Sequence, residues 1–111
     1  MANARTALAA LGDPTRQRMM ERLRGGPCSV GELVTTVAVS QPAVSQHLKI
    51  LKEAGLVFDT AEGTRRIYRI DPKGLGPLRA WLDQFWTDAL TAFSEKADAE
   101  AEAIHKAEKK K

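Results

Sequence analysis

The chain has 111 residues, of which 43% are hydrophobic and 28% charged, and its net charge at pH 7 is +3. This length predicts a single domain over residues 1–106, followed by a Lys-rich tail over 107–111 that frays, and excludes a large two-lobed catalytic cleft. No segment approaches the roughly 20 apolar residues of a membrane span, and the N-terminal residues do not resemble a secretory signal. We therefore expect a cytoplasmic protein with no membrane partner.

Charge is unevenly distributed along the chain. The segment 1–80 holds 12 Lys and Arg against 7 Asp and Glu, whereas the segment 81–105 holds one Lys against six Asp and Glu. A basic body beside an acidic segment indicates a polyanionic partner for the body and another role for the segment.

The sequence predicts no metal site and no cofactor. Cys28 is the only cysteine, and His47 and His105 are isolated from each other, whereas a zinc site needs three or four ligands. Cys28 precedes a helix start, so a redox role for its thiolate is one interpretation. The favoured one is structural, with Cys28 packed on Leu33 before the N-cap Ser29.

Start and stop signals divide the segment 1–55 into four helices. The first covers residues 4–11. The second begins after the capping residue Asp13 and ends at Gly25. Ser29 begins a third helix, with Glu32 at capping-box spacing, and the helix ends near residue 37. Ser40 caps a fourth, which stops at Gly55.

The rest of the chain predicts a hairpin and one long helix. Residues 57–70 are β-prone on both sides of Gly63, which can take the positive φ of a tight turn. Apolar residues then recur at three- and four-residue spacing from about Pro77 to Lys106. The fold class is therefore mainly α with a two-stranded hairpin as its wing: four helices, two strands and a final helix.

Only two or three residues separate the third and fourth helices, which is typical of a helix-turn-helix whose second helix enters the major groove. At about 100° per residue, the polar side chains of that second helix fall in one arc, opposite the apolar ones. The residues that we expect to contact DNA there are Ser40, Gln41, Pro42, Ser45, Gln46, Lys49 and Lys52.

These residues have different expected roles. Gln46 suits adenine, whereas Lys49 and Lys52 suit phosphates. The alternative is an ordinary solvated face, but a surface helix without a partner usually carries more charge than this one. His47 falls in the apolar arc, so we expect it to be packed, with a phosphate contact as the alternative.

The predicted wing is basic near its tip. Arg65 and Arg66 directly follow the turn, Arg69 lies further along the strand, and Thr64 lies in the turn itself. We expect these four residues to contact phosphates or an adjacent minor groove. The alternative is that the arginines only protect an edge strand from aggregation.

The stretch SVGELVTTVAVSQPAVSQHLKILKEAGLV, followed by GTRRIYRI and preceded by LGDPTRQRMMERL, resembles the ArsR/SmtB family of bacterial winged-helix repressors from residue 6 to about 93. The resemblance implies a dimer that blocks transcription from an operator, often that of its own gene. GELVTTV lacks the cysteine pair of metal-binding members, and Asp83 has no histidine two residues later. The resemblance is therefore to members without the known metal sites, and the small-molecule effector is unknown.

Four of the six aromatic residues lie on the final helix, more than a small core can absorb. We expect this helix and the first one to form a homodimer contact in which aromatic residues serve as anchors. A ligand pocket lined by the same aromatics is the alternative. The predicted interface residues are Leu8, Leu11, Leu78, Trp81, Leu82, Phe85, Trp86 and Phe93.

Two functions are compatible with these patterns. The first is a repressor that binds a near-palindromic operator in double-stranded DNA, although activation is not excluded. The second is a protein-interaction module built on a winged-helix scaffold. An enzyme is not expected, because the chain has no Gly-rich phosphate loop, no nucleophile elbow and no pairing of His with Cys or Asp on one face.

Overall fold

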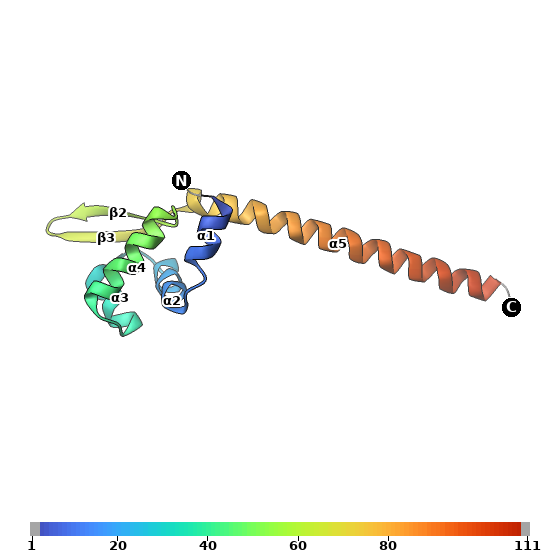
Figure 1. The fold of residues 1–111 in the computed structure, drawn as a ribbon, viewed down its shortest axis with the longest axis horizontal. Helices are drawn as coiled ribbons and strands as arrows, with labels where there is room; N and C mark the ends of the chain where they lie inside the picture. The colour runs from blue at the N-terminus through green and yellow to red at the C-terminus, as the bar shows by residue number, and fades with distance from the viewer. Residues whose placement is uncertain (1–2, 110–111) are drawn as a thin grey trace. The chain divides into compact units, whose positions relative to one another are not determined.

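The computed structural model describes residues 3–109 and contains five helices and three strands in that range. The contacts define two units, Met1–Ala80 and Trp81–Lys111, and α5 runs from the first into the second. The elements are α1 (Ala4–Ala10), α2 (Pro14–Arg24), β1 (Cys28–Ser29), α3 (Val30–Val37), α4 (Gln41–Glu53), β2 (Val57–Glu62), β3 (Arg65–Ile70) and α5 (Pro72–Lys109), as Figure 1 shows.

Each of the first four helices begins with a side-chain cap. The side-chain oxygens of Asn3, Asp13, Ser29 and Ser40 accept hydrogen bonds from the backbone N–H three residues later, at 2.8–3.3 Å. Such a cap satisfies one of the amides that a helix start leaves without a partner. The helix starts predicted at Asp13, Ser29 and Ser40 are confirmed.

The sheet has three strands rather than the predicted two. β2 and β3 form the expected antiparallel hairpin, and Gly63 in its turn has φ +63°. β1 pairs with the other edge of β3, with Cys28 opposite Tyr68 and Ser29 opposite Ile67, so the strand order is β1-β3-β2. A two-residue strand is too short to show an alternating pattern, which is why the sequence does not reveal it.

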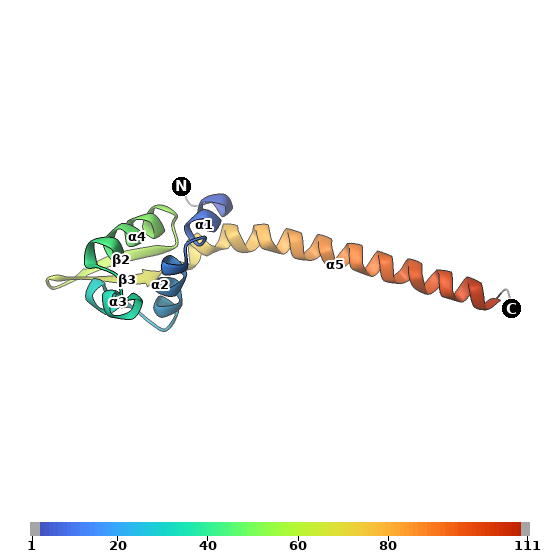
Figure 2. The same cartoon turned by 60° about the horizontal axis from the view of Figure 1, so that its bottom comes forward.

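The core of the first unit lies where α2, α3 and α4 pack on one another and on the base of the sheet. Met19, Leu33, Leu48 and Leu56 are among its largest side chains with almost no exposed surface. Beyond this base the hairpin extends past the helices, so that its tip is surrounded by solvent (Figures 1 and 2).

The last helix begins at Pro72, ahead of the predicted start at Pro77. The Asp71 carboxylate accepts a hydrogen bond from the Lys73 amide at 3.0 Å, and Pro72 needs no amide partner at the first position. Gly74, Gly76 and Pro77 weaken the helical signal in the sequence, but burial of Leu78 holds this turn on the core.

Close backbone packing explains one of these glycines. A Cβ on Gly74 would overlap the carbonyl oxygen of Gly55, the residue that ends α4 in a left-handed conformation with φ +77°. After this turn the Leu56 amide bonds to the Leu51 carbonyl at 3.0 Å, as in a Schellman motif. The start of α5 therefore lies directly on the turn between α4 and β2.

In the second unit, α5 is a single exposed helix. Trp86 is 68% exposed and Phe93 73%, so these aromatics are not part of a core, as the sequence argument expected. The helix continues through 107–109, which belong to the predicted tail, and residues 110 and 111 lie outside the described residues. None of the described helices has the length and apolar character needed to span a membrane.

The Gly74 contact gives a stability test. Gly74→Ala should lower the free energy of unfolding by about 2 kcal/mol, because the new methyl group must displace backbone. Gly76→Ala, two positions along the same helix, should change it by less than about 1 kcal/mol, because no atom beyond the adjacent residues and the helix's own backbone lies within 4 Å of the new methyl group and only the following Pro77 disfavours it. Urea unfolding followed by circular dichroism measures both, and equal effects of the two substitutions would contradict this packing.

Candidate nucleic-acid interface

The polar arc predicted for the fourth helix is exposed in α4. Val44, Leu48 and Leu51 are buried, which fixes the opposite side of the helix against the core. The predicted DNA-contacting residues on this helix all lie on the exposed side: Gln41, Pro42, Ser45, Gln46, Lys49 and Lys52. The division of α4 into a packed face and an outward face is therefore confirmed, whereas the contacts with DNA stay a prediction.

A tight turn links α3 to α4. Ala38 ends α3 in a left-handed conformation with φ +54°, and Ser40 already caps the next helix. The Ser40 hydroxyl accepts from the Ala43 amide at 3.3 Å, so it has a structural role besides the predicted contact with DNA. This short connection holds α3 against α4, in the arrangement of a helix-turn-helix.

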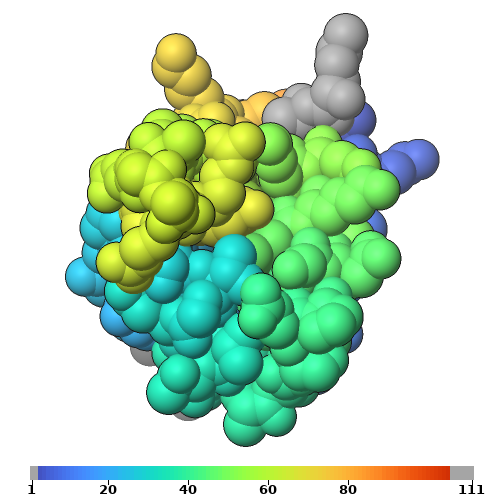
Figure 3. Space-filling model, turned by 90° about the vertical axis from the view of Figure 1, so that its left-hand side faces the viewer, coloured from blue at the N-terminus to red at the C-terminus, as the bar shows by residue number. Residues whose placement is uncertain are grey.

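The wing and the start of α4 meet at a surface hollow of about 350 Å³. Gln41 lies on one side, Thr64, Arg65 and Arg66 on another, and the first turn of α3 lines the rest. Figure 3 shows this face, where the wing (yellow-green) borders α3 (cyan) and α4 (green). Residues predicted separately from the helix and from the wing thus surround one concave site.

Two of the wing arginines pair with half-exposed carboxylates. Arg65 lies 2.9 Å from a Glu32 carboxylate oxygen, and Arg22 lies 4.0 Å from the other. Glu32 therefore joins α3 to the wing instead of closing the predicted capping box with its side chain. Arg69 donates to Thr60 at 2.7 Å and to Glu62 at 3.0 Å, all within the hairpin.

Asp59 on β2 joins the wing to α4. One carboxylate oxygen lies 2.8 Å from the Lys52 ammonium, and the other lies 3.4 Å from Nε of Arg66. The Asp59 side chain is only 6% exposed, whereas those of both cations are more than half exposed. The hydrogen bond from Lys52 and the nearby positive charge of Arg66 hold the pKa of Asp59 below its ordinary value, against the opposing effect of burial.

His47 is packed on the inner side of α4, as predicted. Its Nδ1 lies 3.2 Å from the Arg16 guanidinium, which also donates to the Ala10 carbonyl at 2.6 Å. A guanidinium can only donate, so Nδ1 is the acceptor in this contact, and the same nitrogen lies 3.9 Å from an Asp13 carboxylate oxygen. Arg16 therefore connects α2, the end of α1 and the inner face of α4.

Sequence reasoning missed the three charged residues that hold this surface together, Arg16, Glu32 and Asp59. Nothing in the sequence around Arg16 or Glu32 indicates their distant partners, His47 and Arg65. Asp59 did carry a signal, because strict alternation along the strand places it on the same face as the buried Val57. A carboxylate on an inward face requires a cation beside it.

Cys28 is buried, with Sγ donating to the Gly26 carbonyl at 3.5 Å. Burial raises the pKa of the Cys28 thiol, which disfavours the thiolate that a redox role needs. Cys28 and Leu33 belong to the same core, as the structural interpretation expected. Among the side chains of residues 3–105, no three His, Cys, Asp or Glu groups gather as a metal site would require.

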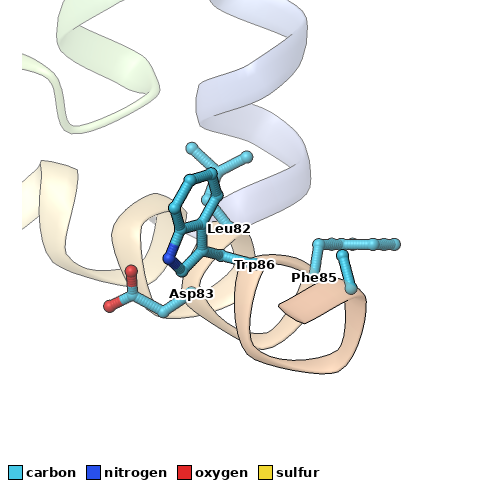
Figure 4. A pocket seen from close by; sticks show the side chains of 5 residues that line it. Leu82, Asp83, Phe85 and Trp86 are labelled. Carbon is cyan, nitrogen blue, oxygen red and sulfur yellow. The ribbon is translucent and has the colours of Figure 1, made fainter. Parts of the chain in front are cut away.

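The predicted interface residues fall into two groups. Leu11 and Leu78 pack in the core of the first unit, so they contribute little exposed surface. Leu8 and the aromatic residues of α5 are exposed. Within the second unit, Leu82, Phe85 and Trp86 line a hollow on α5 (Figure 4), and the Trp81 and Phe85 rings meet edge to face at 4.6 Å.

A helix-turn-helix with an outward polar face, next to a basic hairpin, defines a winged helix-turn-helix protein of the DNA-binding type. The family model described as "Bacterial regulatory protein, arsR family" matches residues 13–58. The chain is also 54% identical over 96 residues to the HTH-type transcriptional regulator Rv2034 of Mycobacterium tuberculosis, an alignment covering 86% of this chain and 90% of that protein. The chain belongs to the arsR family of transcriptional regulators, which are DNA-binding proteins and not enzymes.

Other relatives agree with this assignment. The chain is 32% identical to the transcriptional repressor SdpR of Bacillus subtilis, over 68% of this chain and 84% of that protein. A crystal structure of a possible transcriptional regulator for arsenical resistance superposes with a TM-score of 0.68 at 41% identity, covering 81% of this chain and 94% of the other. The homodimeric winged helix-turn-helix domain Mb0332 of Mycobacterium bovis, solved by NMR, gives 0.61 at 28% identity, over 77% and 79%.

The lowered pKa of Asp59 predicts how stability depends on pH. An ionised Asp59 stabilises the fold above its unfolded pKa of about 3.9, and this contribution is lost as the pH falls through the lower folded pKa. Asp59→Asn should lower the free energy of unfolding by about 1 kcal/mol at pH 6. The exposure of both cations keeps this loss small. In urea unfolding, the difference in the free energy of unfolding between Asp59→Asn and the unsubstituted protein should become smaller below about pH 4. A difference that does not change with pH would contradict the stabilising role of the ionised Asp59.

Proposed function

We propose that the protein is a homodimeric repressor that binds a near-palindromic operator in double-stranded DNA. The hollow between Gln41 and the wing arginines is the observation that carries this proposal. This hollow brings Gln41, which would contact a base, close to the arginines that would bind phosphates. Two copies related by a twofold axis would place such faces on half-sites about one helical turn apart.

The exposed side chains of α4 divide into two roles. Gln41, Ser45 and Gln46 lie near the start of the helix, where short polar groups approach base edges in the major groove. A Gln side chain in this position pairs with adenine through two hydrogen bonds. Lys49 lies one turn further, where its longer side chain suits the phosphate backbone.

The wing contributes sequence-independent contacts. Arg65 and Arg69 pair with Glu32 and Glu62, whose side chains are about half exposed. Exposed ion pairs of this kind are weak, so a DNA phosphate can take the place of either carboxylate. Arg66 differs because its carboxylate partner is buried, and Thr64 lies close to it in the turn.

The exposed face of α5 fits the dimer part of the proposal. Leu82, Phe85 and Trp86 present a continuous apolar surface, with Phe93 further along the same side of the helix. An apolar surface of this kind on a soluble protein marks an interaction site. The homodimeric Mb0332 domain, which shares the fold, supports a second copy of this chain as the occupant.

We propose that the protein represses transcription and does not activate it. Its relative SdpR is named a transcriptional repressor, which supports this choice. The proposal includes repression of the protein's own gene. It also implies a cytoplasmic location, because a protein that binds an operator must reach the bacterial chromosome.

The first experiment is a mobility-shift titration with DNA from directly upstream of the gene, against a shuffled sequence of equal length. It is run at near-physiological salt, because a basic protein binds any DNA when salt is low. We expect a preference of about 10³ or more for the upstream DNA. Equal affinity for both sequences would contradict autoregulation, and the absence of DNA binding would favour the protein-interaction module.

Substitutions on α4 and in the wing should have different effects. Gln46→Ala should lower the affinity for the operator while leaving that for shuffled DNA unchanged, because it removes a base contact. Arg65→Ala should weaken binding to both sequences and reduce the slope of log affinity against log salt by about 1. Titrations at three salt concentrations separate these outcomes, and unchanged operator binding by both variants would refute the assignment of these residues.

The dimer contact is tested by Trp86→Glu, which places a charge in the apolar face of α5. We expect sedimentation at micromolar concentration to shift from a dimer to a monomer, with circular dichroism unchanged because Trp86 contributes to no core. Gln84→Glu is the matched control, since it adds the same charge on nearly the opposite side of the helix and should leave the dimer intact. A Trp86→Glu variant that remains dimeric would show that the copies associate through another surface.

A further inference from the structure

We infer that Asp59 is a positioning residue for DNA recognition, which holds the Arg66 guanidinium ready for a phosphate and links the wing to α4 through Lys52. This inference rests on the proposed function and assigns a role to a residue that does not itself contact DNA. The juxtaposition of one buried carboxylate with two exposed cations from two elements carries it.

The burial of Asp59 distinguishes it from the other acidic residues near the wing. Its side chain is 6% exposed, against 45% for Glu32 and 57% for Glu62. A phosphate that approaches from solvent can displace the exposed carboxylates, whereas the Asp59 side chain is almost wholly covered and offers little surface for such an exchange. Asp59 therefore keeps its cations when DNA binds, whereas Glu32 and Glu62 give theirs up.

The geometry at Arg66 leaves its binding edge available. Asp59 lies 3.4 Å from Nε, which is one edge of the guanidinium plane. A guanidinium has five N–H donors in a fixed fork, so the two terminal nitrogens can still bind a phosphate. The Arg66 side chain is 60% exposed and borders the hollow at the wing tip, where a phosphate would arrive.

The Lys52 contact extends this effect to the recognition helix. Lys52 lies in the last turn of α4, and its ammonium donates to the same carboxylate at 2.8 Å. The wing strand and the helix are thus joined through one side chain, so a phosphate held by Arg66 has a defined position relative to the bases read by α4. We therefore assign Lys52 a structural part in place of the independent phosphate contact predicted from the sequence.

A pure effect of net charge and a loss of positioning predict opposite changes in operator affinity for Asp59→Asn. Removal of the carboxylate raises the net charge by one, so electrostatic attraction alone would strengthen DNA binding. If Asp59 positions Arg66, the same substitution weakens operator binding, because Arg66 must then be ordered when DNA binds. Glu62→Gln is the matched control, since it removes one negative charge from the same hairpin at an exposed site.

The experiment measures affinity for the operator at several salt concentrations, at a temperature well below the unfolding midpoint of each variant. We expect Asp59→Asn to bind about tenfold more weakly, and Glu62→Gln to bind as tightly as the unsubstituted protein or more so. Arg66→Lys keeps the charge but lacks the Nε edge, so it should resemble Asp59→Asn. Operator binding by Asp59→Asn that equals or exceeds that of the unsubstituted protein would overturn the inference.

A double-mutant cycle separates positioning from general damage to the fold. In an Arg66→Ala background, Asp59→Asn should cause no further loss beyond about twofold, because the group that it positions is absent. Additive losses would overturn the inference even if both single variants bind weakly. If the unsubstituted protein shows no operator preference, the proposed function fails, and this role for Asp59 fails with it.

Discussion

The left-handed turn at Gly55 is the constraint on which the proposed DNA-binding surface depends. It lies between the end of the recognition helix and the start of the first wing strand, so that the helix and wing diverge from one point. Gly74 packs against the carbonyl of this same residue and leaves no space for a side chain. The position of the wing relative to α4 is therefore fixed at the backbone at this turn and by the Asp59 carboxylate further out.

The charged residues on this surface differ in the burial of their carboxylate partners, and this difference is more important than the number of charges. Lys52 and the wing arginines all lie near carboxylates, so much of the positive charge on the wing and the end of α4 is compensated before DNA arrives. Compensation of this kind reduces attraction to any polyanion, which is the sequence-independent part of DNA binding. In the proposed mode of binding, the exposed partners would yield to a correctly placed phosphate, and the buried one would not. Such a surface favours discrimination between sequences over affinity alone.

Most of the fold could be predicted from the sequence because its signals are local. The caps at Asp13, Ser29 and Ser40 and the turn at Gly63 each need only neighbouring residues, and the structure agrees with all of them. The strand at Cys28 and the early start of α5 could not be predicted, because distant packing stabilises both against weak local preference. Distant contacts also limit what can be predicted for the site, because the sequence indicates α4 and the wing only as separate elements. Their shared hollow and the Asp59 link exist only in three dimensions.

The exposed aromatic residues of α5 are also relevant to DNA recognition. One recognition helix offers three short polar side chains, Gln41, Ser45 and Gln46, near its start. A well-formed base contact gives about 1–3 kcal/mol of discrimination, so the three contacts of a single copy give about 3–9 kcal/mol and cover only part of the roughly 4–10 kcal/mol that separates specific from non-specific binding. In the proposed dimer, a second copy held by the apolar face of α5 would double the contacts and add the spacing of two half-sites as a further requirement. Loss of the α5 contact would therefore reduce operator recognition even with every residue of the DNA-binding surface intact.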